Sequence, residues 1–294
     1  MKSDLAGHSL NVSSLDSKPS SPSKEQTWVK WVLIAIALIY LSLILFIPSL
    51  NVFVQAFKDG LGPFWGNLKE PNFAHAIRLT ILIALIVVPV NTVFGLCAAW
   101  VIARHQFRGR TLLISLLDVP FAVSPVVAGL MIVLLYGRNG WFGPWLDAHN
   151  IKIIFAMPAM VLASSFITLP FVAREVIPVL EESGTEQEEA AKTLGANDWQ
   201  IFWRVTLPNI RWGLLYGVLL TNARTMGEFG AVSVVSGNLA GETQTLPLFV
   251  EEAYKQYQTQ AAFSAAVLLG GLALITLVLK EILERKTSIK DAVE

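Results

Sequence analysis

The stretch IRLTILIALIVVPVNTVFGLCAAWVIA, residues 77–103, decides the fold class. A helix needs about 20 mostly apolar residues to cross roughly 30 Å of hydrocarbon, and this stretch is longer than that. Its one charged residue is Arg78. We therefore expect a transmembrane helix here. Pro89 and Asn91 lie inside it, and we interpret them as a structural kink rather than a ligand site.

Five further apolar stretches flank this one. They cover residues 29–54, 112–136, 153–173, 212–235 and 261–279, and the first is broken near Pro48. The composition agrees, because 54% of the 294 residues are hydrophobic and only 15% are charged. The sequence predicts an all-α integral membrane protein with six transmembrane helices.

The chain divides into four regions by composition. Residues 1–27 are polar, with few large apolar side chains, and are expected to be a disordered tail. They are not expected to belong to a secretory signal, because the apolar run that follows is too long for one. Residues 28–71 hold the first span and an outer loop. Residues 72–283 hold the other five spans and form the main membrane domain, and residues 284–294 form a second tail.

Basic residues in the short loops predict the orientation. Arg104, Arg108 and Arg110 follow the second span, and four more basic residues follow the fourth span. The alternate loops hold fewer, so both termini are expected to be cytoplasmic. The net charge is zero, which gives no electrostatic basis for nucleic-acid binding. The single cysteine, Cys97, cannot form an internal disulfide.

The cytoplasmic loop between spans four and five contains EEAAKTLGANDWQIFWRVTLP, residues 188–208. Thr185 and Glu188 fit a capping box that starts a short helix. Gly195 fits the left-handed position that ends it. Asn197 or Asp198 can cap a second short helix, with Gln200 completing a second capping box to Asn197.

The second short helix is expected to stop at Pro208. The loop is therefore predicted to be a helix–elbow–helix. Either it docks another protein or it lies as an amphipathic hairpin on the membrane surface, with an apolar face made by Trp199, Phe202 and Trp203.

The spacing in this loop resembles the EAA loop of ATP-binding-cassette importer permeases. The family pattern is EAA, three residues, G, nine residues, then I-x-L-P, and this chain departs from it only in having Val205 for Ile. The resemblance implies a cytoplasmic coupling helix that sits on a separate ATPase. The residues that match the motif are Glu189, Ala190, Ala191, Gly195, Leu207 and Pro208.

Two further stretches resemble the oxyanion branch of this family. They are RTMGEFGAVSVVSGNLAGETQTLPLFVE, residues 224–251, and SPVVAGL, residues 124–130. The resemblance implies import of sulfate or thiosulfate across a bacterial plasma membrane, with molybdate or tungstate as the alternative cargo. It also implies a second, related permease subunit, a dimer of ATPases and a periplasmic binding protein.

Arg224 and Glu228 are the charged residues expected deep in the fifth span. Either Arg224 tunes an anion passage and Glu228 helps to place it, or Arg224 forms a structural ion pair with Glu228 or Asp118. Ser124 and Pro125 are expected to break the third span, where freed backbone amides can line the path. Gly227 and Gly230 are expected to allow close helix approach.

No motif in the chain points to catalysis. There is no G-x-x-x-x-G-K-[ST] phosphate-binding loop, so ATP and Mg²⁺ are expected on the partner ATPase. The four histidines are scattered and predict no metal site. An ATP-independent ion-coupled transporter is the rival class, but no inverted repeat is apparent and the EAA spacing is left unexplained. A membrane-embedded enzyme lacks any supporting motif.

Overall fold

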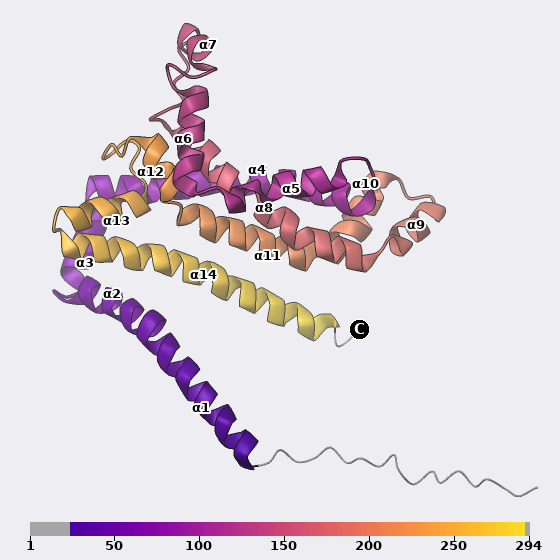
Figure 1. Ribbon diagram of the computed structural model, residues 1–294, viewed down its shortest axis with the longest axis horizontal. Coiled ribbons are helices and arrows are strands. Elements are labelled where there is room, and N and C mark those ends of the chain that lie inside the picture. Colours follow the sequence, from indigo (N-terminus) through magenta and orange to yellow (C-terminus); the bar gives the residue numbers. More distant parts are fainter. Residues whose placement is uncertain (1–23, 292–294) are drawn as a thin grey trace, which may run out of the picture. The chain divides into compact units, whose positions relative to one another are not determined.

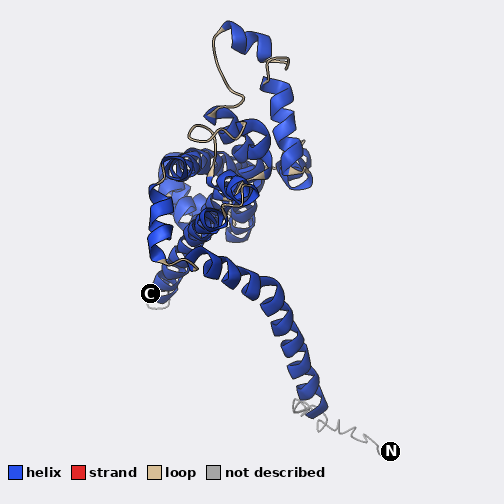
Figure 2. Ribbon diagram, turned by 90° about the vertical axis from the view of Figure 1, so that its left-hand side faces the viewer, coloured by secondary structure: helices blue, strands red, loops and turns tan. Residues whose placement is uncertain are grey.

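The computed structural model describes residues 24–291, which form helices and connecting loops with no strand in that range (Figure 2). Residues 1–23 of the predicted N-terminal tail and residues 292–294 of the predicted C-terminal tail lie outside the described residues. The first helix begins at Lys24 and the last ends at Asp291, so the ends of both predicted tails nearest the membrane domain are helical. The chain divides into two compact units, Met1–Asn51 and Val52–Glu294.

The N-terminal apolar run is one helical stretch. It consists of α1 (Lys24–Leu41), a π-helical turn (Ser42–Phe46) and α2 (Ile47–Phe57). The predicted break near Pro48 is absent. Pro48 has no backbone N–H and cannot donate to the carbonyl of Ile44, four residues earlier. Ile44 lies in the π turn, whose wider geometry accommodates the missing hydrogen bond. The stretch Trp28–Phe57 is long and apolar enough to cross a membrane.

Three long helices form the centre of the second unit. They are α4 (Pro71–Arg104), α8 (Met157–Ser183) and α11 (Leu207–Met226) (Figure 1). Glycines let their backbones approach closely, since a Cβ on Gly95 would lie 2.7 Å from that of Val172, and one on Gly217 would lie 2.8 Å from the Val172 Cα. Asn91 is buried and donates to the Ser165 carbonyl and to Thr168 Oγ1, at 2.9 and 2.8 Å. These bonds hold α4 to α8, and the kink at Pro89 and Asn91 remains a prediction.

The predicted third span is broken, as expected, at Ser124–Pro125. It consists of α5 (Arg110–Ala122) and α6 (Pro125–Tyr136), which meet at an angle of 108°. Ser124 has an extended backbone, the conformation that a following proline favours. A short helix, α7 (Gly143–Ala148), follows in the next loop (Figure 1).

The predicted fifth span is also broken, which was not expected. α11 ends at Met226, and α12 (Gly230–Ser236) begins after a three-residue turn. By length and composition, four helical stretches of the described chain can cross a membrane, or five if the bent α5–α6 pair counts as one span. α11 is not among them, because polar residues such as Arg211, Asn222 and Arg224 interrupt it. Six spans therefore remain a prediction.

The remaining helices complete the second unit. α3 (Leu61–Lys69) precedes α4, and α13 (Leu246–Lys255) packs on α14 (Thr259–Asp291). In the segment between α12 and α13, residues 239–242 are exposed, whereas Thr243, Gln244 and Thr245 are buried. Glu252 of α13 accepts hydrogen bonds from Asn238 and Gln244 and so fixes this segment.

Candidate functional site

The predicted coupling segment is a helix–elbow–helix. It consists of α9 (Glu186–Thr193), a turn at Gly195 and α10 (Asp198–Ile201). Gly195 has φ +87°, the left-handed conformation predicted for it, and a Cβ there would meet no atom within 4 Å. Leu194 beside it is 88% exposed, and Ala190 is also exposed. The elbow therefore offers an open surface with one protruding apolar side chain.

The two predicted capping boxes have different outcomes. Asn197 and Gln200 form theirs, with bonds of 2.8 and 3.0 Å. The box at the start of α9 is wrong. Thr185 caps no backbone amide and donates instead to Glu189 Oε1 at 2.7 Å. Glu188 points to other partners, because a basic side chain from α4 competes for its carboxylate.

That basic side chain is Arg104, the last residue of α4. Its Nε and Nη2 lie 3.1 and 3.0 Å from the two carboxylate oxygens of Glu188. Thr206 Oγ1 donates to Glu188 Oε1 at 2.8 Å. No local pattern in the sequence predicts this arrangement. Arg104 lies beside a short basic loop, and no local spacing links it to a residue 84 positions away.

The second short helix does not stop at Pro208. A π-helical turn (Phe202–Thr206) follows α10, and α11 begins directly at Leu207 with Pro208 in its first turn. As at Pro48, the proline cannot donate a hydrogen bond to the carbonyl four residues earlier, here that of Arg204, and this carbonyl lies in the π turn. Leu207 packs against the cluster around Val176 and Ile210. The segment from Asp198 to Met226 is therefore one continuous helical run.

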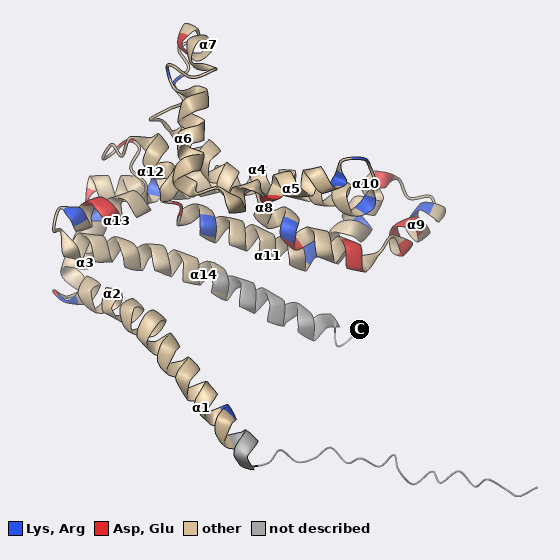
Figure 3. Cartoon of the chain, in the orientation of Figure 1, with Lys and Arg blue, Asp and Glu red and all other residues tan. Residues whose placement is uncertain are grey.

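Charged side chains gather around this segment. Figure 3 shows both acidic and basic residues on α9, an acidic residue on α10 and a basic residue in the loop before α5, whereas α6 carries none. A cavity of about 250 Å³ lies between α4 and the helix–elbow–helix and is lined by both charged and aromatic side chains. No group of three potential metal ligands occurs within the described range.

Arg224 and Glu228 form the expected ion pair. Arg224 Nη1 lies 2.6 Å from Glu228 Oε2, and the side chains are 35% and 0% exposed. Glu228 Oε1 also accepts from the amide of Ala231 at 2.8 Å, so it caps α12. The alternative partner Asp118 is wrong, because Arg174 pairs with it through two nitrogens.

The two helix breaks meet in space. A Cβ on Gly230, at the start of α12, would lie 2.8 Å from the Cβ of Pro125, at the start of α6. One turn further on, a Cβ on Gly129 would lie 2.8 Å from the Ala231 carbonyl oxygen. The structure thus brings Ser124 and Pro125 next to the turn that holds Glu228, although about 100 residues separate them.

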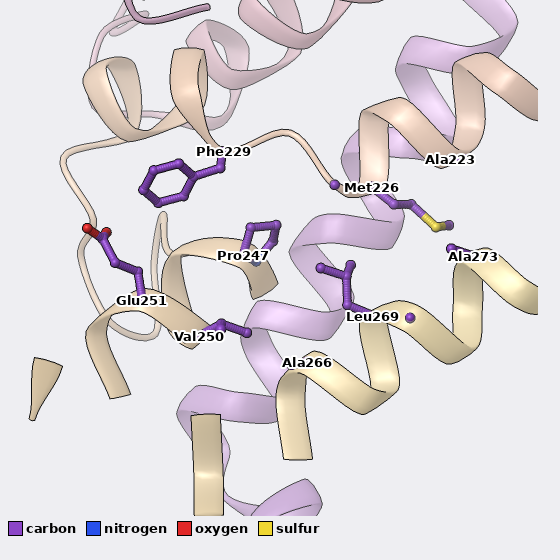
Figure 4. A pocket seen from close by; sticks show the side chains of 11 residues that line it. Ala223, Met226, Phe229, Pro247, Val250, Glu251, Ala266, Leu269 and Ala273 are labelled. Carbon is purple, nitrogen blue, oxygen red and sulfur yellow. The ribbon is translucent and has the colours of Figure 1, made fainter. Parts of the chain in front are cut away.

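Gly227 does not have the role predicted for it. A Cβ there would come no closer than 3.5 Å to its nearest neighbour, so no helix approaches it closely. It lines an apolar cavity of about 490 Å³ between the end of α11, α13 and α14. Figure 4 shows Met226, Phe229 and Pro247 around this space. Gly227 therefore ends α11 without tight packing.

The described residues form helices, several of them apolar and long enough to cross a membrane. An exposed helix–elbow–helix is continuous with one of the central helices. This is the architecture of a transport permease. Residues 91–289 match the family described as "Binding-protein-dependent transport system inner membrane component". The chain belongs to this family.

Relatives with sulfate-transport names are similar over most of their length. The chain is 67% identical to "Sulfate transport system permease protein CysW" of Synechocystis sp., covering 90% of this chain and 96% of that protein. It is 56% identical to the protein of the same name from Escherichia coli, covering 87% and 88%. Identity to "Sulfate transport system permease protein CysT" of E. coli is 39%, covering 81% and 87%.

A solved structure has the same fold. It is the "bacterial alginate ABC transporter in complex with alginate pentasaccharide-bound periplasmic protein", with a TM-score of 0.76 and 15% identity. The match covers 90% of this chain and 96% of that chain. The fold of this chain is thus that of an ATP-binding-cassette importer permease.

Proposed function

We propose that the chain is the W-type permease subunit of an ATP-driven importer that carries sulfate, and the related anion thiosulfate, across the bacterial plasma membrane. The higher identity to CysW than to CysT, 67% against 39%, favours the W type. The observation that carries the coupling role is the exposed elbow at Leu194 and Gly195, joined to α11 by an unbroken helical run.

The elbow is the docking surface for the ATPase. Ala190, Ala191 and Gly195 keep the surface low, and Leu194 protrudes from it as an apolar anchor. Burying an exposed apolar side chain such as this one against a partner favours docking. Glu189 carries an exposed charge on the same helix. Because Leu207 and Pro208 begin α11 directly, a displacement of α10 moves α11 with it.

Transport requires other subunits. ATP and Mg²⁺ bind to a dimer of ATPases, a T-type permease completes the pore, and a periplasmic sulfate-binding protein delivers the anion. Both termini lie in the cytoplasm. ATP closes the ATPase dimer, draws the two elbows together and opens the path outward, and hydrolysis resets it. This cycle requires that ATP bind the two states with different affinities.

The anion path lies beside the two helix breaks. Arg224, 35% exposed, supplies a positive charge on α11, and the adjoining turn holds Gly227 and Glu228. Ser124 and Pro125 supply the opposite break. Because Glu228 offsets much of the charge on Arg224, a divalent anion is held weakly at this point and leaves readily.

Co-purification with the ATPase tests the docking role. The tagged chain is expressed with its T-type partner and ATPase, and the wild type is compared with Gly195→Asp. Gly109→Asp is the matched control, because Gly109 also has a left-handed φ, +105°, and open space around it, but lies in another loop. We expect only Gly195→Asp to lose the ATPase. If the wild type retains no ATPase, or both variants behave alike, docking at the elbow is wrong.

Uptake into proteoliposomes tests the substrate. Radioactive sulfate should enter only with ATP, the ATPase and the binding protein present. Excess thiosulfate should compete, whereas stronger competition by molybdate or tungstate would favour the alternative cargo. Uptake that continues without ATP would instead support an ATP-independent anion transporter.

A further inference from the structure

Arg104 lies at the meeting point of four segments. Its guanidinium engages both carboxylate oxygens of Glu188 on α9, and Nη1 donates to the Leu180 carbonyl on α8 at 2.8 Å. Thr206 of the π turn donates to the same carboxylate. We call Arg104, Leu180, Glu188 and Thr206 the ion-pair cluster. It joins the end of α4, the end of α8, α9 and the start of α11.

The ion-pair cluster is shielded from solvent. The side chains of Arg104 and Glu188 are 8% and 17% exposed. Arginine is suited to this position, because its planar fork binds a carboxylate through two bonds and leaves a nitrogen for the carbonyl. Removing one partner of a shielded pair strongly destabilises the folded protein, because the other charge is left uncompensated.

Few other contacts hold α9. The helix has no buried residue. Gln187 accepts a hydrogen bond from Asn209 at 2.6 Å, and Lys192 pairs with Asp198 at 3.7 Å, but both contacts are exposed. Among the described contacts, Glu188 is therefore the one residue of α9 that bonds to the end of α4.

We propose that Arg104 is a positioning residue that transmits the movement of α9 to α4. This inference rests on the proposed docking of an ATPase at the elbow. The chain itself carries a force on α9 to its neighbours, because Gly184 and Thr185 join α9 to α8, and residues 194–197 join it to α10 and so to α11. The force reaches the end of α4 through the ion-pair cluster. Without Arg104, a docked α9 moves while the end of α4 stays behind.

The prediction is a loss of coupling with docking retained. In the reconstituted complex, Arg104→Gln should keep the ATPase bound and hydrolysing ATP. Sulfate uptake per ATP should fall by about 5- to 150-fold, the range of typical coupling free energies. Arg104→Lys keeps the charge without the fork and should fall between Arg104→Gln and the wild type. Thr206→Val removes one hydrogen bond only and should give a smaller loss in a fully folded protein.

Arg110→Gln is the matched control. Arg110 pairs with Glu181 at 2.6 Å and donates to the Ile102 carbonyl, so it joins the ends of α5, α8 and α4 but does not touch α9. Its uptake per ATP should stay near the wild-type value. An equal loss in Arg110→Gln would overturn the inference, because general weakening of this end would then explain the effect.

A covalent link should replace the ion pair. In a Cys97→Ser background, cysteines are placed at positions 104 and 188 and joined by a short bis-thiol cross-linker. Uptake per ATP should be low before cross-linking and should recover after it. Unchanged uptake in Arg104→Gln and Thr206→Val, or loss of the ATPase from Arg104→Gln, overturns the transmission role. A wild type that binds no ATPase refutes the proposed function instead.

Discussion

Glu228 offers a test that separates two roles of one carboxylate. Oε1 accepts from the Ala231 amide at 2.8 Å, and Oε2 pairs with Arg224 at 2.6 Å. Glu228→Gln keeps a carbonyl oxygen for the amide but removes the charge. Glu228→Leu removes both. The difference in the free energy of unfolding between the two variants therefore measures the capping hydrogen bond. The loss of unfolding free energy that both variants share measures the ion pair.

The magnitudes follow from the exposure of the two side chains. Removing one partner of a fully buried pair costs about 3–5 kcal/mol, but Arg224 is 35% exposed and regains water. We therefore expect Glu228→Gln to cost ~1–2 kcal/mol, nearer the value of exposed pairs. Glu228→Leu also leaves the Ala231 amide without a partner, which adds ~1–3 kcal/mol.

Thermal unfolding in lipid nanodiscs measures both variants. A change of 1 kcal/mol shifts the midpoint by about 2–4 °C in a protein of this size range. Glu228→Leu should therefore fall several degrees below Glu228→Gln. Equal midpoints for the two variants would refute the capping role, and a wild-type midpoint for Glu228→Gln would refute the contribution of the charge.

The reverse substitution adds a second check on the same pair. Arg224→Gln leaves a carboxylate with 0% exposure and no cation, so it should destabilise more than Glu228→Gln. The double variant should recover part of that loss, because it removes the uncompensated charge. A double variant whose losses simply add would show that the pair contributes no coupling energy.

Four further substitutions test the packing of glycines, a buried hydrogen-bonding side chain and one helix cap. Gly230→Ala should cost ~1–3 kcal/mol by driving a Cβ into Pro125, whereas Gly227→Ala meets nothing closer than 3.5 Å and should unfold near the wild-type temperature. Asn91→Leu should lower the unfolding temperature through the loss of its two hydrogen bonds to α8, at a cost of ~1–3 kcal/mol; a stabilised variant would contradict this. Asn197→Ala should cost ~1 kcal/mol of local stability, visible as faster amide hydrogen exchange in α10 alone.

The sequence by itself determined the features that depend on a few neighbouring residues. The left-handed turn at Gly195, the Asn197 capping box and the break at Pro125 follow from backbone sterics and from hydrogen bonds within one helical turn. The Arg224–Glu228 pair is one turn apart on the chain, so it too was predictable. The apolar runs predicted the membrane class for the same local reason.

Only the tertiary structure decided which distant side chains meet. Glu188 satisfies a local capping pattern with Thr185, yet it binds Arg104 because α4 ends beside α9. Asp118 pairs with Arg174, 56 residues away, for the same reason. The continuation of the helix through Pro208 also depended on more than local rules. A π turn absorbs the missing hydrogen bond there, and the packing of Leu207 against α8 and α11 residues accompanies it.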